Sequence, residues 1–457
     1  MTDRSEGFPQ EVRDRFDPVI ARHVLRAFDW ALARSPQRER ELARLGRLLL
    51  AHHADHISLA SMLLTQAAPA DALSELSAEF GAETTQLVSD TRNLALASVA
   101  SGDAGTPDLR ALMESMTRDV RAVFLNAAFR VSELESAAAS TRETADVEPL
   151  AREALDVHVP IAERLGFYQL RRRLEDAAFR ILEPEVYREL ATAVAPIQGQ
   201  DDACMAILVD GVLRLLSRNG VAAEVTGRTK GLHSLYQKML RTELPVDQIM
   251  DRVGVRVIVD AVPTCYQVLG LVHSHFCPIP GTFNDYIGRP KENGYQSLHT
   301  CVHPLLNTSA KPVEFQIRTA VMHANAEFGA AAHWRYKSVI DADCIRSDQL
   351  RWLKDLSARC RDLDSPEFVE ELRRQVYEEQ IVVFEEGGRQ LRLPVGSTVH
   401  DFLHRTRGRN HKLVTVHVNG TRAGEDHVLR DGDTLDTSTS RPAQAPPSAG
   451  VGEPRRG

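Results

Sequence analysis

The spacing of apolar residues divides the chain into parts with different periods. In the N-terminal part, apolar residues recur every three to four positions, as in ARHVLRAFDWALARS (21–35) and DVRAVFLNAAFRVSELESAAA (119–139). This is the period of an amphipathic helix. Stretches with Gly, Pro and Ser, such as SGDAGTPD (101–108), separate the helical segments. The pattern predicts an all-α domain over residues 1–195.

Between residues 200 and 343 the pattern alternates between helix and strand. The helical segment AILVDGVLRLLSR (206–218) is followed by the turn pair Asn219-Gly220 and a short apolar strand. The segment VGVRVIVD (253–260) is rich in β-branched residues and predicts a buried strand. Helices and strands alternate here, which predicts one domain that contains both over residues 200–343.

A second strand, PVEFQIRT (312–319), alternates strictly between apolar and polar residues. Successive side chains of a strand point to opposite faces, so Val313, Phe315 and Ile317 share one face. The opposite face carries Glu314, Gln316 and Arg318. That face could be ordinary solvent-facing alternation, or it could belong to a polar site.

The remaining chain predicts three further parts. Residues 344–378 are rich in Arg, Asp and Glu and predict a charged helical connector. Residues 379–440 contain short strands around one helix, which favours a small β-grasp module. The tail, residues 441–457, is poor in apolar residues and is expected to be disordered.

Composition limits the class of protein. The net charge of −8 gives no general attraction to nucleic acid, so any such contact must be local. The six cysteines form no CxxC pair and fit a reduced, cytoplasmic protein. No apolar run reaches the ~18 residues of a membrane-spanning helix, so no membrane partner is expected.

Candidate chemistry concentrates in NDYIGRPKENGYQSLH (284–299). This segment combines a cation (Lys291), an amide (Asn293), an aromatic ring (Tyr295) and a further polar donor (His299). Together with Glu314, these are the parts of a nucleotide pocket: donors for phosphates, a ring for the base and a carboxylate for a metal or a proton.

Five ordered blocks resemble the RelA/SpoT homologue family, which makes and degrades the alarmone (p)ppGpp. They are TGRTKGLHSLYQKM (226–239), VDQIMDRVGVRVIV (246–259), FNDYIGRPKENGYQSLHT (283–300), VEFQIRT (313–319) and MHANAEFGAAAHWRYK (322–337). Five blocks in order are far more specific than one motif. The resemblance implies an all-α HD-like domain, an α+β nucleotidyltransferase-like synthetase domain with a mixed sheet, and a small β-grasp TGS domain at the C-terminus.

The resemblance also implies the reaction and the residues that carry it. Pyrophosphate would pass from ATP to the 3′-hydroxyl of GTP or GDP, with Mg²⁺ as cofactor. The matching positions are Asp251 and Glu314 for the metal and catalysis, Arg228, Lys230 and Lys238 for ATP, and Lys291, Asn293, Tyr295 and His299 for GTP or GDP. Gln316 and Arg318 would support Glu314, whose face they share.

Several of these residues have a simpler interpretation. Asp251 could be a turn residue at the entrance of a strand. Arg228 and Lys230 could form a solvated basic loop, and Tyr295 could be core packing. His323 and Glu327, spaced i, i+4, favour a pair on a helix surface over a site.

The N-terminal domain departs from the hydrolysing members of the family, which bind a metal there through His-Asp and Glu-Asp pairs and a later Asp. Thr65 and Gln66 stand at the first pair, Pro69 and Ala70 at the second, and Phe129 at the later Asp. These side chains do not replace carboxylate or imidazole ligands. We therefore expect a degenerate domain without hydrolase activity and a monofunctional synthetase.

Two further departures affect specificity and control. The family carries either a basic or an acidic segment before DYI, and Thr282-Phe283-Asn284-Asp285 is neither, which leaves the preference between GDP and GTP open. In the TGS-like module, His411 matches a position that contacts tRNA in long members, or is an ordinary turn histidine. Ribosomes or uncharged tRNA are the expected partners, although the chain ends before the further modules of long members.

The sequence leaves a competing function. A catalytically silent nucleotide-binding regulatory protein would be free to lose its catalytic set, as the N-terminal positions apparently did. Retention of Arg228, Asp251 and Glu314 favours an active enzyme. A bifunctional enzyme conflicts with the replaced hydrolase positions.

Overall fold

The computed structural model describes most of the chain as two compact units, Met1–Val376 and Tyr377–Gly457. The described residues are 7–99, 118–139, 147–249, 252–291, 293–303, 312–329, 352–359, 365–377, 380–385, 390–407, 414–430 and 432–439. Each unit has its own hydrophobic core. Three predictions of the sequence analysis lie outside these residues: Asp251, His411 and the tail over residues 441–457.

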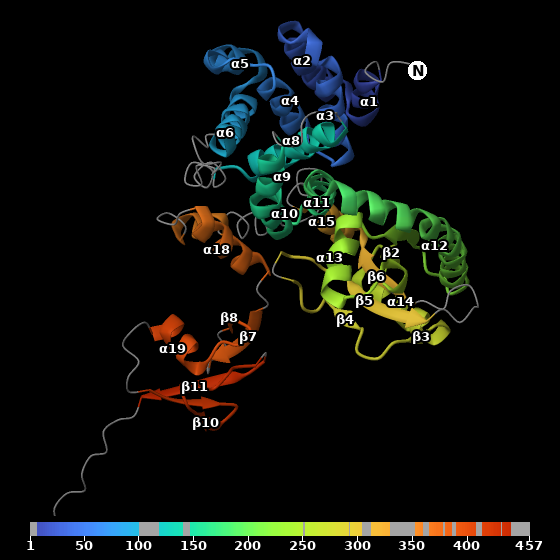
Figure 1. Ribbon diagram of the computed structural model, residues 1–457, viewed down its shortest axis with the longest axis vertical. Helices are drawn as coiled ribbons and strands as arrows, with labels where there is room; N and C mark the ends of the chain where they lie inside the picture. Colours follow the sequence, from blue (N-terminus) through green and yellow to red (C-terminus); the bar gives the residue numbers. More distant parts are fainter. Residues whose placement is uncertain are drawn as a thin grey trace, which may run out of the picture. The chain divides into compact units, whose positions relative to one another are not determined.

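The N-terminal part of the first unit is helical, as predicted (Figure 1). Its helices are α1 (Phe8–Arg15), α2 (Pro18–Arg34), α3 (Glu39–Ala51), α4 (His56–Thr65), α5 (Leu73–Phe80), α6 (Ala82–Val99), α8 (Val120–Ala139), α9 (Glu148–Glu153), α10 (Val159–Arg164) and α11 (Tyr168–Leu182). Local sequence signals fix several ends. Asp17 caps α2 by accepting hydrogen bonds from the backbone N–H groups of Val19 and Ile20. Apolar side chains from most of these helices form one core, which Leu353, Leu356, Phe368 and Leu372 of the predicted connector join.

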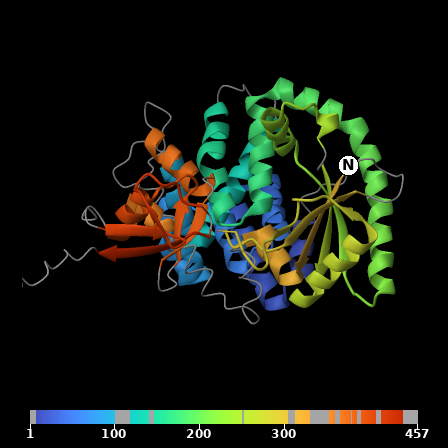
Figure 2. The ribbon, with the colours of Figure 1, turned by 90° about the horizontal axis from the view of Figure 1, so that it is seen from below.

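A long helix connects the helical part to the sheet. Helix α12 (Pro184–Arg218) runs without interruption across the predicted boundary between residues 195 and 200. Its last turns bury Val212 and Leu216 against the sheet core. Figure 2 shows the helix running alongside the sheet. The helix contains Pro196, which removes one backbone N–H donor from the helix interior.

The sheet of the first unit is mixed and has the strand order β1-β2-β6-β5-β3, with β4 paired to β5. The strands are β1 (Glu224–Thr229), β2 (Val253–Val259), β3 (Cys277–Pro278), β4 (Asn284–Asp285), β5 (Leu298–His303) and β6 (Val313–Thr319). Only β2 and β6 pair in parallel among these strands. Helices α13 (Leu232–Thr242), α14 (Val262–His275) and α15 (Ala320–Phe328) complete this part. The predicted α+β architecture with a mixed sheet is confirmed.

The two faces of β6 have different surroundings. Phe315 and Ile317 of β6 are fully buried in the sheet core, as the alternation predicts. The opposite face of β6 is also covered, because Gln316 and Arg318 are buried. The polar face is therefore enclosed by protein and is not ordinary solvent-facing alternation.

The second unit is a small five-stranded sheet with one helix. Its strands follow the order β10-β9-β11-β7-β8, where β7 and β11 pair in parallel. They are β7 (Gln380–Glu385), β8 (Gln390–Pro394), β9 (Val414–Val418), β10 (Thr421–Ala423) and β11 (Thr434–Thr439). Helix α19 (Val399–Arg407) buries Phe402 and Leu403 in the core. The unit has the small-sheet fold predicted for residues 379–440.

None of the helices in the described parts of the chain combines the length and the apolar character needed to cross a membrane. The connector is described over residues 352–359 and in α18 (Ser365–Tyr377), both helical as predicted.

Candidate active site

A cavity of about 270 Å³ lies between the polar face of β6 and the corner of α10 and α11. Among the residues that the structure describes, its lining is strongly cationic: six Lys and Arg side chains face three Glu side chains. The cations are Arg171, Arg228, Lys230, Arg252, Lys291 and Arg318, and the acids are Glu163, Glu314 and Glu327. In a chain with a net charge of −8, this local excess of positive charge indicates a site for an anion.

Glu314 is the carboxylate at the centre of the predicted site. It sits on β6 opposite Gly254 of β2, where a Cβ atom on residue 254 would lie 3.1 Å from the Glu314 carbonyl oxygen. Its Oε1 atom is 3.2 Å from His299 Nδ1, and its Oε2 atom accepts a hydrogen bond of 3.1 Å from Gln316 Nε2. Burial opposes ionisation, but the hydrogen bond and charge of His299, with Lys230 and Gln316, outweigh it and lower the pKa of Glu314. The carboxylate is therefore ionised and oriented.

The loop Lys291–Tyr295 is closed by its own hydrogen bonds. The Lys291 N–H donates to the Tyr295 carbonyl oxygen, and the Gly294 N–H donates to the Lys291 carbonyl oxygen. Gly294 has φ of 76°, which favours glycine at this turn. The Asn293 side-chain oxygen accepts from the Tyr295 N–H. This turn holds the Lys291, Asn293 and Tyr295 side chains at the cavity.

Tyr295 and His299 are joined inside the cavity. The Tyr295 hydroxyl lies 2.8 Å from His299 Nε2, so His299 bridges Tyr295 and Glu314 through its two ring nitrogens. Burial raises the pKa of Tyr295, and the nearby charge of Arg318 opposes that shift. Tyr295 is one of the residues that line the cavity, and its ring also contacts the rings of Tyr286 and His299.

Arg228 and Lys230 reach the cavity from the end of β1 and the residue after it. Arg228 Nη1 donates to Gln316 Oε1 over 3.1 Å, and its guanidinium lies 4.8 Å from the centre of the Tyr168 ring. Lys230 lines the same cavity, so the two residues do not form a solvated loop. Lys238, by contrast, lies on α13 and is not among the lining residues.

A buried ionic cluster forms the cavity floor. Arg318, only 1% exposed, donates through Nη2 to Glu327 Oε1 over 2.8 Å and lies 2.8 Å from His323 Nδ1. Arg256 Nη2 lies 2.7 Å from the same Glu327 oxygen. Burial and the charge of Arg318 lower the pKa of Arg256 to about 10. Our interpretation of His323 and Glu327 as a helix-surface pair is wrong, because Glu327 is buried between the guanidinium groups of Arg256 on β2 and Arg318 on β6.

The sequence analysis missed a whole wall of the cavity. Glu163, Gly166, Tyr168 and Arg171 come from the α10–α11 corner of the helical part. No periodic signal separates these residues from ordinary helix positions. The run of three arginines at 171–173 was the one local signal that could have drawn attention to α11.

In the N-terminal part, the positions compared with hydrolase ligands have structural surroundings. The Thr65 hydroxyl donates to the Ser61 carbonyl oxygen, and Arg38 donates to the Gln66 side chain. Phe129 packs against the helical core, and Pro69 precedes a short 3₁₀ turn that begins at Ala70. Among the residues that the structure describes, no group of three or more His, Cys, Asp and Glu side chains is arranged to hold a metal ion.

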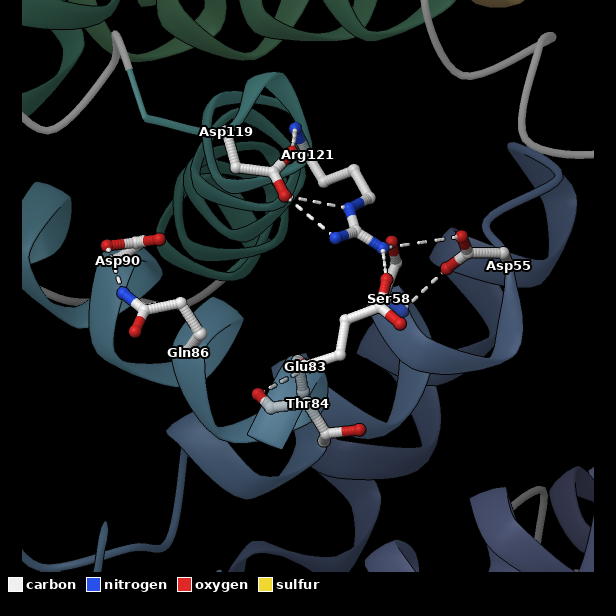
Figure 3. A network of polar contacts seen from close by, with 9 residues as sticks. Asp55, Ser58, Glu83, Thr84, Gln86, Asp90, Asp119 and Arg121 are labelled. Carbon is white, nitrogen blue, oxygen red and sulfur yellow. Dashed lines mark hydrogen bonds and ion pairs between the residues drawn. The ribbon is translucent and has the colours of Figure 1, made fainter. Parts of the chain in front are cut away.

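A polar network between α4, α6 and α8 gathers three carboxylates around one cation (Figure 3). The Arg121 guanidinium lies 2.8 Å from both Asp119 and Glu83 and 3.9 Å from Asp55. Asp55 also caps α4 by accepting from the Ser58 N–H. Burial would lower the pKa of Arg121, but hydrogen bonds to Asp119 and Glu83 and the charge of Asp55 raise it. Within this network, one guanidinium contacts all three carboxylates and offsets part of their negative charge.

Comparison with protein families assigns all three parts. The architecture defines a three-part protein with a cation-rich cavity on a mixed sheet. Residues 227–341 match the region found in RelA/SpoT proteins, residues 37–168 match an HD domain, and residues 381–437 match a TGS domain. The chain belongs to the RelA/SpoT family, with HD, synthetase and TGS domains.

Curated relatives carry names of both activities of the family. The GTP pyrophosphokinase of Streptomyces coelicolor is 36% identical over 395 residues, 82% of this chain and 46% of the relative. The GTP pyrophosphokinase of Escherichia coli is 34% identical over 73% of this chain and 45% of the relative. A probable guanosine-3′,5′-bis(diphosphate) 3′-pyrophosphohydrolase of Synechocystis is 33% identical over 81% of this chain and 49% of the relative. The chain spans about half the length of these relatives.

Among solved structures, the small alarmone synthetase 1 from Bacillus subtilis is similar to part of the chain. It is 23% identical and covers 40% of this chain and 96% of its own, with a TM-score of 0.28.

Proposed function

We propose that the protein is a GTP diphosphokinase that transfers pyrophosphate from ATP to the 3′-hydroxyl of GTP or GDP. One observation carries the proposal. Cations from distant parts of the sequence meet in one cavity beside an ionised, hydrogen-bonded carboxylate, Glu314. Transfer between two polyanionic nucleotides needs this combination, because positioning and charge neutralisation supply most of the catalysis.

The chemical step is a displacement at the β-phosphorus of ATP. The 3′-hydroxyl oxygen of the acceptor attacks, its bond to phosphorus forms, and the bond between the β-phosphorus and the α–β bridging oxygen breaks. AMP leaves with that oxygen, and the hydroxyl proton passes to Glu314 or to water that it orients. His299 and Gln316 hold the two oxygens of Glu314 and so fix its direction.

Mg²⁺ is the proposed cofactor. Magnesium binds through one or two carboxylates together with substrate phosphates, and the Glu314 carboxylate at the cavity wall fits that requirement. Glu314 and Asp251 would hold the ion. When bound, it would neutralise phosphate charge.

We also propose nucleotide-binding roles for the other residues of the site. Arg228 and Lys230 would contact ATP, with Lys238 as a further phosphate contact. Lys291, Asn293, Tyr295 and His299 would contact GTP or GDP, and Gln316 and Arg318 would support Glu314. Tyr295 is the base-stacking candidate, because a ring at a cavity wall can offer a face to guanine.

We further propose that the enzyme is monofunctional. The side chains of Thr65, Gln66, Pro69 and Phe129 lack metal-ligand chemistry, and Thr65, Gln66 and Phe129 have partners of their own in the helical part. The HD domain, residues 1–195, would then act as a scaffold or regulatory surface for the synthetase domain, residues 200–343.

The partner of the TGS domain is proposed to be a ribosome or uncharged tRNA, contacted through His411. We also propose a cytoplasmic location for the protein. Deletion of residues 378–457 tests the partner: any stimulation of synthesis by ribosome–tRNA complexes should disappear. An equal response of truncated and full-length protein would exclude a sensing role.

The function itself is tested by incubating the purified protein with labelled ATP, GTP or GDP, and Mg²⁺. Formation of AMP together with pppGpp or ppGpp is expected, and separate reactions with GTP and GDP give the acceptor preference. Nucleotide binding without product, across a range of activating partners, would favour the silent regulatory protein instead.

A further inference from the structure

The wall that the helical part contributes to the cavity contains an ion pair. Helix α10 ends at Arg164 and α11 begins at Tyr168, with Gly166 at φ of 75° in the turn between them. The close packing of this turn on α15 fixes its place. A Cβ atom on Gly329 would lie 2.3 Å from the Leu165 carbonyl oxygen. The corner is therefore held against the synthetase domain by backbone contact.

Arg171 is the cation of this wall. Its guanidinium forms an ion pair with the Glu163 carboxylate, and its Nε atom lies 3.1 Å from Glu175 Oε1. Of these two carboxylates, Glu163 lines the cavity and Glu175 does not. Burial, and then the charge of Arg171, lower the pKa of Lys291, while Glu314 opposes the shift. Arg171 and Lys291 thus direct positive charge into the same space.

Glu163 holds groups from both domains. Besides its ion pair with Arg171, its Oε1 atom lies 3.4 Å from Asn293 Nδ2, and its carbonyl oxygen accepts from the same amide over 3.2 Å. Asn293 belongs to the loop that we assign to the acceptor nucleotide. The two carboxylate oxygens of Glu163 therefore occupy a position between a guanidinium and an amide, both of which are good phosphate donors.

We propose that Arg171 is a phosphate-binding residue for the acceptor nucleotide, and that Glu163 occupies the phosphate position until the nucleotide displaces it. The inference rests on the proposed function. Arginine binds phosphate through a planar fork of N–H groups, and phosphate carries more charge than one carboxylate. Glu175 would keep Arg171 oriented during the exchange. The displaced Glu163 side chain, 27% exposed, already reaches solvent.

The size of the cavity supports a displacement. Pockets for one drug-sized ligand occupy roughly 300–1,000 Å³, and this cavity has about 270 Å³. Two nucleotides need more room than that. Movement of Glu163 out of the cavity would free both volume and donors at the acceptor loop.

The test is equilibrium binding of GTP and ATP to the full chain, measured by calorimetry, with four variants. Glu163→Gln keeps the shape and removes the charge, so GTP should bind about tenfold more tightly, since a hydrogen bond to a charged group contributes roughly 1.4 kcal/mol or more. Arg171→Gln should weaken GTP binding about tenfold, and Arg171→Lys should restore part of it. In the double variant, which combines Glu163→Gln with Arg171→Gln, GTP should bind no more tightly than in Arg171→Gln alone. Glu163 competes with the nucleotide for Arg171, so its removal has no effect once Arg171 is absent. ATP affinity should change less throughout.

The matched controls are Arg180→Gln, at an exposed position on the same helix, and Glu185→Gln, at the exposed start of α12. Both should leave GTP binding unchanged. Thermal unfolding identifies variants that fail to fold, and Glu163→Ala replaces Glu163→Gln in that case. Unchanged or weaker GTP binding in the folded Glu163 variant, or unchanged binding in Arg171→Gln, would overturn the inference.

Binding and product formation are read separately. Wild-type protein that binds GTP but forms no alarmone refutes the proposed function, while the affinities still decide the roles of Glu163 and Arg171. If product forms but the GTP affinities of the Glu163 and Arg171 variants equal that of the wild type, only this inference is refuted. Wild-type protein that binds neither nucleotide refutes both.

Discussion

The Arg121 network of the HD domain and the Glu314 cavity of the synthetase domain use the same side chains in opposite proportions. Around Arg121, one guanidinium serves three carboxylates, Asp55, Glu83 and Asp119. Among the described residues that line the cavity, three glutamates face six cations. Two of these cations also pair with carboxylates outside the lining: Arg252 with Asp201, and Arg171 with Glu175. The first arrangement places a protein cation among its acids, whereas the second has positive charge in excess.

This difference separates a structural network from a binding site. The Arg121 guanidinium already contacts three carboxylates, so it has few N–H donors left for an external anion. Excess positive charge at a partly buried cavity lowers the free energy of a bound polyanion, because an opposite charge relieves the repulsion among the cations. The comparison predicts that charge changes at the cavity alter activity, and that charge changes around Arg121 alter stability.

The largest effect is expected from Glu314→Gln. The amide keeps the shape and removes the charge that would hold Mg²⁺ and receive the proton in the proposed mechanism. Loss of such a group typically costs about 10²–10³-fold in kcat. Product formation should therefore fall below detection in a standard assay, with unchanged thermal unfolding. The matched control is Glu224→Gln, the same change at an exposed position of β1 in the same sheet. Synthesis near the wild-type rate in Glu314→Gln would refute the assigned mechanism.

Tyr295→Ala is expected to have the next largest effect. Stacking of a base on an aromatic ring is worth about 1–3 kcal/mol, so the KM of the acceptor nucleotide should rise roughly ten- to a hundredfold. The KM of ATP should change far less. Tyr295→Phe keeps the ring but loses the contact between the hydroxyl and His299, and should keep an acceptor KM near that of the wild type. Equal losses for both nucleotides would instead indicate a packing role.

Much of the architecture follows from local patterns. The alternation in residues 312–319 correctly separates the core face of β6 from the face that carries Glu314. The segment around Lys291 and Tyr295 is also predicted to belong to the site, and it lies at the cavity. Its turn could be predicted because residues such as Gly294 determine the local backbone conformation. Helical periods in residues 1–195 reflect burial along single helices, which sequence reports directly.

Contacts between distant segments could not be predicted in the same way. Glu163 and Arg171 reach the cavity only because the α10–α11 corner packs against α15, and no local pattern records that packing. Glu327 has the helical spacing of a surface residue, yet two arginines from neighbouring strands bury it. The protein thus places charged residues by tertiary packing, which overrides the solvent-facing default of the sequence pattern.

The Arg121→Met variant tests whether the Arg121 network contributes to stability and not to activity. The substitution leaves three carboxylates without their shared cation. Removing one partner of a buried ion pair costs several kcal/mol, and the exposure of Glu83 reduces that cost, so we expect the free energy of unfolding to fall by about 2 kcal/mol. Denaturant titration measures the change, with Arg22→Met at an exposed position of α2 as control. Synthesis at temperatures below unfolding should stay at the wild-type rate. Unchanged stability would show that the network contributes little.

The smallest expected effect is on hydrolysis, where we predict none. Release of pyrophosphate from ppGpp by an HD-type site requires a bound metal, and Thr65, Gln66, Pro69 and Phe129 offer no carboxylate or imidazole to hold one. Incubation of labelled ppGpp with the wild-type protein and Mn²⁺ should give the same GDP as a protein-free reaction, while a hydrolysing member of the family run in parallel releases pyrophosphate. Arg121→Met should give the same result, because the carboxylates that it exposes lie at other positions than the compared ligand residues. Pyrophosphate release that a chelator abolishes would contradict the prediction and assign a second activity to the HD domain.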